Sequence, residues 1–395
     1  MSLAEVLARP SSPARADDAA PAITAEPLAS ALARRGAWTK LAARAAEPNV
    51  FAEPAMLSAL ADHLGMADIR LAWAQCGEGA APVLALPFRV RRSPFTAGVA
   101  VAESLWSRYG PLGTPLVEAG AERQAAAAIL ALPARLGVAA LVMPYQRLDG
   151  PVAGAIEAEA GRQGLGLIRR NTAFRAALDT RRGEAALGDA GTAKRRKEHG
   201  RLLRRLGDRG FVTFTASSDP EAIPGLLDEF LALERTGWKG RQGTALADRP
   251  ASLALARALV GALGAEGRVR IDALRLDGRP VAMLLTLLAG PAAATWKTAY
   301  DEAYAAFSPG LLLMAQLTRS LLAEGRLGHV DSLAVPGHPM IEKVWSGRME
   351  VGTLVIPAQG REAAARRALA AMDLTLAGRA LAARAVRGAK RALRR

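Results

Sequence analysis

The chain has 395 residues, of which 51% are hydrophobic and 23% charged, and its net charge is +15. That length allows a substantial buried core and favours two or three domains. The single cysteine, Cys76, excludes an internal disulfide framework and a cysteine-based zinc site, and the four histidines lack metal-ligand spacing. The composition therefore predicts a globular protein that holds no metal.

The N-terminal segment and the longest apolar run predict a soluble, cytoplasmic protein. Residues 1–22 have no continuous apolar core of signal-peptide length, and residues 1–35 are expected to be disordered. The longest apolar run, 281–296, is interrupted by Gly290 and Pro291. It is also shorter than the roughly 20 residues that are needed to cross a bilayer.

Residues 36–180 alternate between helical and strand patterns. Helical spacing covers 38–64, and a strand hairpin is predicted around the turn at 77–79. The elements that follow are a helix over 121–136, a strand over 138–145, a helix over 151–164 and a strand over 164–178. This order predicts a first lobe over 36–180, followed by a polar linker over 181–193.

Residues 194–358 repeat that organisation in fuller form and predict a second lobe. The predicted helices cover 194–210, 219–236, 251–264 and 309–324. The predicted strands cover 211–217, 268–300 (three antiparallel strands), 328–333 and 351–357. Asp277-Gly278 and Gly290-Pro291 mark the tight turns between the three antiparallel strands. The pattern predicts an α+β fold of two similar lobes.

Two basic segments are suited to anionic partners. Seven basic residues and one acidic residue lie between Lys194 and Arg205. This segment is either an exposed linker helix or an RNA-binding surface, although it lacks interleaved aromatic residues that stack on bases. Residues 361–395 carry a net charge of +8 and predict a basic amphipathic helix over 359–395. That helix either packs on its own domain or binds an anionic membrane surface.

A dense set of polar and aromatic side chains lies just before the start of a predicted helix. Lys297, Tyr300, Asp301 and Tyr304 precede the helix start at 308–310. The first turn of a helix presents free backbone N–H groups and a partial positive charge to a phosphate. The segment is therefore the leading candidate for a functional site.

The second lobe resembles a GNAT-fold acyltransferase. The resemblance is carried by FLALERTGWKGRQGTAL at 230–246, RIDALRLDGRPVAMLL at 270–285, KTAYDEAYAAFSPGLLL at 297–313 and DSLAVPGHPMIEKVWSGR at 331–348. Within that superfamily the chain is similar to cellulose-biosynthesis acetyltransferases and to tandem-lobe Fem-type aminoacyl transferases. The resemblance implies tandem GNAT-like lobes, each a mixed, mostly antiparallel sheet flanked by helices.

The same resemblance implies a donor site for acetyl-CoA or another acyl-CoA at this helix start. In the GNAT fold the pyrophosphate rests on backbone amides there. The residues assigned to the donor are Lys297, Phe307, Ser308, Gly310, Leu311 and Leu312. The matching stretch departs from the usual loop of the family, because it has one glycine, no leading arginine, and a proline, Pro309, that removes one N–H donor.

Direct acyl transfer needs a base, donors for an oxyanion and an acid for the leaving thiol. Asp301 is either the base or a turn residue that accepts loop N–H bonds. Tyr300 or Tyr304 is the candidate acid, with simple packing as the alternative for each. Asp331, at the end of the next strand, completes the catalytic candidates. A backbone N–H of the preceding strand would serve the oxyanion.

The acceptor side is assigned to Glu234, Trp238, Lys239, Arg241 and His338. Trp238, in a glycine-rich loop, is either a lid over the acceptor or an anchor at a helix end. Lys239 and Arg241 favour an acidic or phosphate-bearing acceptor. His338 lies in a turn and faces either the acceptor or solvent.

The sequence therefore predicts transfer of an acetyl or acyl group from acyl-CoA to an amine or hydroxyl of a sugar, a polysaccharide precursor or a small molecule. Two alternatives stay open. One is aminoacyl transfer from charged tRNA. The other is an inactive GNAT-fold binding module in the synthesis of envelope polysaccharides.

Overall fold

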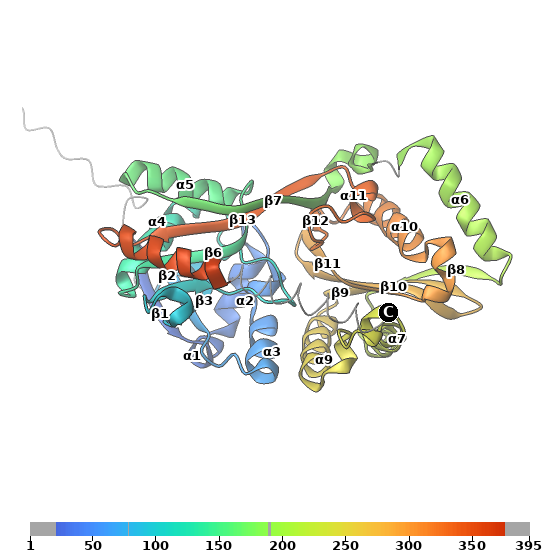
Figure 1. The fold of residues 1–395 in the computed structure, drawn as a ribbon, viewed down its shortest axis with the longest axis horizontal. Coiled ribbons are helices and arrows are strands. Elements are labelled where there is room, and N and C mark those ends of the chain that lie inside the picture. Colours follow the sequence, from blue (N-terminus) through green and yellow to red (C-terminus); the bar gives the residue numbers. More distant parts are fainter. Residues whose placement is uncertain (1–20, 78, 189–190, 376–395) are drawn as a thin grey trace, which may run out of the picture.

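A computed structural model describes residues 21–77, 79–188 and 191–375. Two sheet-containing lobes lie side by side, and two long strands, β7 and β13, run between them (Figure 1). Within the described residues the strands follow the order β1-β2-β3-β4-β6-β13-β7-β12-β11-β10-β9-β8, with β5 beside β3. The predicted α+β fold with mixed, mostly antiparallel sheets is confirmed.

The first lobe holds the elements up to β6 and α5. Its strands are β1 (Ala22–Pro27), β2 (Arg70–Gln75), β3 (Pro82–Arg91), β4 (Val101–Ser104), β5 (Leu116–Val117) and β6 (Ala140–Arg147). Its helices are α1 (Leu28–Leu32), α2 (Arg35–Ala43), α3 (Pro54–Leu64), α4 (Glu122–Arg135) and α5 (Pro151–Gln163). Apolar side chains of α4 and α5 pack on the sheet and form one buried cluster with it.

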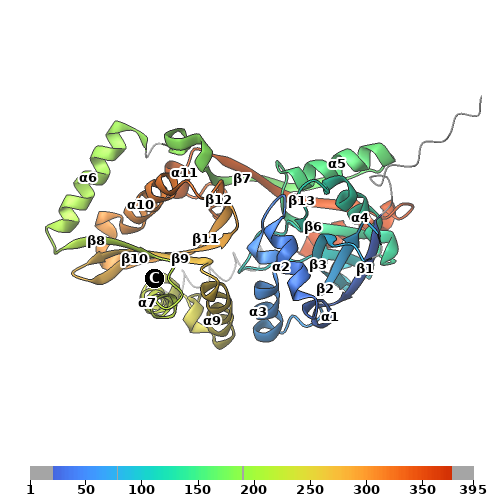
Figure 2. The same ribbon diagram turned by 180° about the vertical axis from the view of Figure 1, so that it is seen from behind.

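The second lobe holds the elements from α6 to α11. Its strands are β8 (Val212–Ser217), β9 (Val269–Leu276), β10 (Arg279–Ala289), β11 (Ala292–Tyr300) and β12 (His329–Asp331). Its helices are α6 (Ala193–Gly207), α7 (Ile223–Thr236), α8 (Trp238–Arg241), α9 (Pro250–Ala265), α10 (Pro309–Glu324) and α11 (Ile341–Val344). Helices α7 and α9 cover one face of the sheet, and α10 and α11 the other (Figure 2).

The three-stranded meander forms where the turn residues predict it. β9, β10 and β11 pair antiparallel in succession. Asp277 and Gly278 have φ of 49° and 78°, the left-handed pair that a two-residue hairpin turn of type I′ requires. The helix predicted over 309–324 is α10, and it ends at Gly325, whose φ is 62°.

Strands β7 (Ile168–Asp179) and β13 (Arg348–Pro357) connect the lobes. β13 pairs with β6 on one side and with β7 on the other, so the last strand of the chain lies among the strands of the first lobe. β7 in turn pairs with β12 of the second lobe. The sequence assigned 351–357 to the second lobe, because local pattern does not reveal which sheet a strand joins.

The N-terminal segment is more structured than the sequence indicated, and the described part of the C-terminal segment is helical. Disorder through residue 35 is wrong for β1, which pairs with β2, and for α1. The alternation of Ile23 and Ala25 with polar neighbours lets a short strand cover the edge of the sheet. Residues 362–375 are helical, and Ala365 and Leu369 pack on β6 and β13. Residues 376–395, which hold most of the basic charge of the predicted helix, lie outside the described residues.

A shared core joins the lobes on one side of the sheet. Leu57 and Leu60 of α3 belong to the same buried cluster as Leu255 and Leu259 of α9. The described residues contain no helix that is long and apolar enough to span a membrane. They also hold no group of three or more His, Cys, Asp or Glu side chains arranged to bind a metal ion.

Candidate active site

The central feature of the second lobe is a gap between two neighbouring strands. β11 and β12 run parallel and pair over three residues, from Ala292 with His329 to Ala294 with Asp331. Beyond that point Thr295–Tyr300 stay paired with β10, whereas the chain after Asp331 turns away. Strand ends that diverge in this way leave backbone groups of β11 free to meet a ligand.

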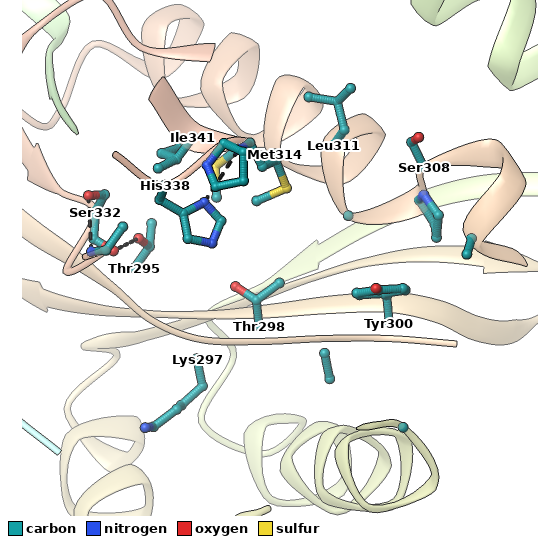
Figure 3. Close-up of a pocket in the computed structure, with 18 of the residues that line it drawn as sticks. Thr295, Lys297, Thr298, Tyr300, Ser308, Leu311, Met314, Ser332, His338 and Ile341 are labelled. Atoms are coloured by element: carbon teal, nitrogen blue, oxygen red, sulfur yellow. Dashed lines mark hydrogen bonds between the residues drawn. The ribbon is translucent and has the colours of Figure 1, made fainter. Parts of the chain in front are cut away.

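A cavity of about 750 Å³ opens at this divergence. It is lined by the second half of β11, the start of α10, the segment after β12, and the end of α7 with α8. Figure 3 shows Thr298 and Tyr300 pointing from β11 toward the side where Ser308, Leu311, Met314 and His338 lie. The cavity therefore lies between the open edge of a strand and the first turn of a helix.

The start of α10 offers one free backbone donor. Ser308 adopts a left-handed conformation with φ of 50°, and its carbonyl accepts the N–H bonds of Leu311 and Leu312 at 3.0 and 3.1 Å. Pro309 has no N–H, and the N–H of Gly310 has no acceptor within the described residues. A Cβ on Gly310 would lie 3.7 Å from Met340 and 4.0 Å from Tyr300, which are ordinary van der Waals contacts.

Lys297 lies on the opposite face of β11. A bulge at Trp296 shifts the register with β10, and Figure 3 shows Lys297 pointing away from α10. Its Nζ lies 5.5 Å from the ring centroid of Tyr109 and 5.4 Å from that of Trp296. Burial, together with the nearby charge of Lys239, lowers the pKa of the Lys297 amine from 10.5 to about 8. A substantial fraction of this amine is therefore neutral near pH 8.

A buried carboxylate, Glu234, is paired with the partly exposed Lys239 at the edge of the cavity. Lys239 Nζ donates to Glu234 Oε1 at 2.7 Å and to the carbonyl of Thr298 at 2.8 Å, and the second Glu234 oxygen accepts the N–H of Leu246 at 2.7 Å. The Thr298 carbonyl thus faces the open edge of β11. The N–H of a strand residue points the same way as its carbonyl, so the Thr298 N–H also faces the gap.

His338 and Trp238 line the cavity from opposite sides. His338 Nδ1 accepts the N–H of Met340 at 3.4 Å, which leaves the Nε2–H as the donor that can reach a ligand. Trp238 is 42% exposed, and its backbone N–H donates to Glu302 at 3.2 Å. It is not a buried anchor, and its position at the rim is the one that a lid would occupy.

Nine of the residues that the sequence assigned line this cavity: Glu234, Trp238, Lys239, Lys297, Tyr300, Ser308, Gly310, Leu311 and His338. The others lie outside it. Asp301 caps the short 3₁₀ helix η7 (Glu302–Phe307) by accepting the N–H of Ala303 at 2.9 Å. Tyr304 packs on Phe307, Leu312 is buried in the core, and Arg241 is ion-paired with Glu302. Contacts within the protein account for the positions of these side chains, and no ligand is needed to explain them.

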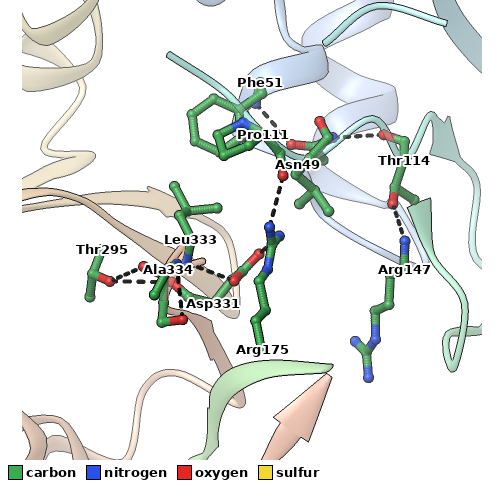
Figure 4. A network of polar contacts seen from close by, with 12 residues as sticks. Asn49, Phe51, Pro111, Thr114, Arg147, Arg175, Thr295, Asp331, Leu333 and Ala334 are labelled. Atoms are coloured by element: carbon green, nitrogen blue, oxygen red, sulfur yellow. Dashed lines mark hydrogen bonds and ion pairs between the residues drawn. The ribbon is translucent and has the colours of Figure 1, made fainter. Parts of the chain in front are cut away.

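Asp331 also lies outside the cavity, in a polar network that joins the lobes (Figure 4). Its carboxylate is ion-paired with Arg175 of β7 and accepts the N–H of Leu333 at 2.9 Å. Arg175 also donates to the carbonyl of Pro111 at 2.9 Å. Asp331 thereby holds the segment after β12 against a loop of the first lobe, over residues 105–114.

Several lining residues were not predicted. Arg108 and Tyr109 of the first-lobe loop reach the edge of the site, and Trp296 Nε1 donates to the Tyr109 carbonyl at 2.6 Å. His199 of α6 is buried against the cavity, and burial lowers the pKa of its imidazole. Its spacing of three and seven residues from Leu202 and Leu206 marks it as an inward position, a signal that the sequence did contain.

Comparison with known proteins agrees with this geometry. Residues 193–338 match a family model described as an acetyltransferase (GNAT) domain. The second lobe therefore contains a domain that is similar to GNAT-superfamily acetyltransferases. The match supports the predicted superfamily for this part of the chain. The GNAT domain spans α6 to the turn that carries His338, and so contains the strand divergence and the start of α10. No curated protein matches the sequence.

Solved structures show that the tandem arrangement recurs. FemX is 11% identical with a TM-score of 0.52, over 82% of this chain and 96% of that one. A conserved protein of unknown function from Bacteroides thetaiotaomicron is 11% identical with a TM-score of 0.52, over 82% and 97%. The C-terminal domain of a putative lysylphosphatidylglycerol synthetase from Agrobacterium fabrum is 14% identical with a TM-score of 0.50, over 87% and 96%. At these identities the likeness concerns the fold.

Proposed function

We propose that the protein transfers an acyl group from acetyl-CoA or another acyl-CoA to an amine or hydroxyl of a sugar, a polysaccharide precursor or a small molecule, in the cytoplasm. The observation that carries the proposal is the cavity between the open edge of β11 and the start of α10. Its volume of about 750 Å³ is in the range of small-molecule sites.

The donor is proposed to lie along the α10 side of β11. Its pyrophosphate meets the free N–H of Gly310 and the positive end of the helix dipole. Lys343, which also lines the cavity, adds positive charge near the phosphates. Tyr300, close to Gly310, contacts the donor chain, and the thioester reaches the bulge at Trp296.

The acceptor is proposed to approach from the Lys297 side. The neutral Lys297 amine takes a proton from the attacking amine or hydroxyl while the new bond to the acyl carbon forms. The Thr298 N–H donates to the developing oxyanion. The carbon–sulfur bond then breaks, the Nε2–H of His338 donates a hydrogen bond to the leaving sulfur, and the thiolate takes up a proton from solvent. The products are the acylated acceptor and free CoA.

Titration calorimetry with acetyl-CoA and with desulfo-CoA tests the donor site. Wild-type protein is expected to bind both saturably, because the phosphates rather than the thioester dominate contact with α10. Gly310→Glu places a carboxylate beside the pyrophosphate and should weaken binding by at least about tenfold, or about 1.4 kcal/mol. Gly310→Ala is the matched control, since the added Cβ meets only ordinary contacts. Equal affinities for Gly310→Glu and the wild type would refute this donor site.

Aminoacyl transfer from charged tRNA is the second candidate, and α6 is the observation that favours it. Helix α6 begins beside the cavity, where Arg195 and His199 line it, and its exposed face is rich in arginine and lysine. This reading expects RNA binding whose affinity falls steeply with salt. Binding of acetyl-CoA together with salt-insensitive, weak RNA binding would exclude it.

A further inference from the structure

A second, smaller cavity of about 120 Å³ lies between the lobes. It shares Glu234, Trp238, Lys239 and Lys297 with the lining of the larger cavity, so the two adjoin. Its remaining walls come from Arg108 and Tyr109 of the first lobe and from the segment 244–252 of the second. Its volume is that of about four water molecules, which suits one carboxylate or phosphate group but not a nucleotide.

Positive charge dominates the walls of this cleft. Three cationic side chains, Arg108, Lys239 and Arg249, and the Lys297 amine, whose pKa is about 8, face one carboxylate, Glu234. That carboxylate is already used, because Lys239 and the N–H of Leu246 bind its two oxygens. Neither Arg108 nor Arg249 has an ion-pair partner in the described part of the chain. The Arg108 guanidinium lies over the ring of Tyr109, 5.3 Å from its centroid.

The first-lobe loop is held firmly at this position. The Tyr109 hydroxyl lies 2.5 Å from the Ser252 hydroxyl, and the Tyr109 carbonyl accepts the Trp296 indole N–H at 2.6 Å. Arg175 binds the carbonyl of Pro111 two residues later. Arg108 is therefore presented to the cleft by a loop that is fixed to the second lobe, and binding an anion there requires little reorganisation.

We infer that this cleft binds an anionic group of the acceptor, a carboxylate or a phosphate, through Arg108 and Arg249. The inference rests on the proposed function and specifies its acceptor. Arg108 and Arg249 are exposed at the edge of the cleft, so an anion that binds there can form charge-assisted hydrogen bonds with both guanidinium groups. An acceptor anchored there passes Lys297 on its way to the edge of β11, where the acyl group is transferred. Lys239 and Arg241, which the sequence assigned to this role, are neutralised by Glu234 and Glu302.

Calorimetric titration of the full chain with inorganic phosphate and, separately, with succinate tests the inference. At least one of the two anions should bind saturably. Tighter binding of phosphate indicates a phosphate-bearing acceptor, and tighter binding of succinate indicates a carboxylate-bearing one. Arg108→Gln and Arg249→Gln should each weaken that binding by about tenfold, the loss expected for one charge-assisted hydrogen bond. Arg257→Gln is the matched control, because Arg257 is exposed on α9 and paired with Asp228.

Titration of acetyl-CoA into the same samples separates the two claims. Acetyl-CoA should bind wild type and Arg108→Gln alike, and Gly310→Glu should leave anion binding unchanged. If acetyl-CoA binds and neither anion does, the anionic acceptor is refuted and the proposed function stands. Anion binding that Gly310→Glu weakens and Arg108→Gln does not would place the anion at α10 and would refute the inference. Absence of acetyl-CoA binding refutes the proposed function, and with it the acceptor assignment.

Discussion

Replacing Lys297 with methionine is expected to lower the rate of acyl transfer by about 10²–10⁴-fold, the usual contribution of a general base. Methionine keeps the length and the apolar stem of lysine but cannot accept a proton. In the wild type, kcat/KM should rise with pH, pass an inflection near 8 and then level off, because the amine acts in its neutral form. Steady-state assays between pH 6 and about 10 measure both effects.

The thermal stability of Lys297→Met provides the control for this variant, because stability should rise while the rate of acyl transfer falls. The folded protein holds Lys297 at a pKa of about 8, below its unfolded value of 10.5, so the unfolded state binds more protons between these values. The stability contributed by this group therefore rises with pH across that window, and at pH 7 the buried charge is unfavourable. Lys297→Met should unfold at a higher temperature at pH 7. A variant with the wild-type rate and pH profile would rule out Lys297 as the base.

Breaking the ion pair between Arg175 and Asp331 is expected to produce the largest loss of stability. The side chains are 3% and 4% exposed, so Arg175→Met leaves an uncompensated buried carboxylate. Removing one partner of a buried pair typically costs about 3–5 kcal/mol. The Pro111 carbonyl also loses its donor, and the first-lobe loop is no longer tied to β7. Urea denaturation of the variant and the wild type measures the change in the free energy of unfolding.

Two further variants separate the ion pair from general effects of the substitution. Arg170→Met removes an arginine from the same strand, but its partner Asp373 is 51% exposed, and the expected change is below about 1 kcal/mol. The double variant Arg175→Met/Asp331→Leu removes both charges and should recover a large part of the lost stability. A double variant less stable than Arg175→Met would contradict the buried-charge explanation.

Local sequence signals were sufficient to predict most of the second lobe. The meander follows from three apolar runs separated by turns whose residues tolerate positive φ, as Asp277-Gly278 does. The start of α10 follows from Pro309 in the first turn. The concentration of polar side chains between Lys297 and Ser308 then predicted the location of the cavity. These features depend on residues close together in the chain, which is why pattern alone was sufficient.

Other features depend on contacts that no local pattern encodes. Arg175 and Asp331 are distant in the chain, so Asp331 resembled a catalytic carboxylate until its partner was known. Arg108 and Tyr109 join the site from the other lobe. The bulge at Trp296 interrupts the strand register, and Lys297 points away from the helix start on which the sequence placed it. Asp301 proved to be a capping residue, a role that spacing alone cannot distinguish from that of a base.

A crystal structure of the protein with acetyl-CoA would locate the donor. We expect the pyrophosphate to lie at the Gly310 N–H and the thioester oxygen to accept the N–H of Thr298. Lys297 should then face the acyl carbon from the side opposite α10. A donor bound elsewhere, or a thioester oriented away from the gap between β11 and β12, would contradict the account.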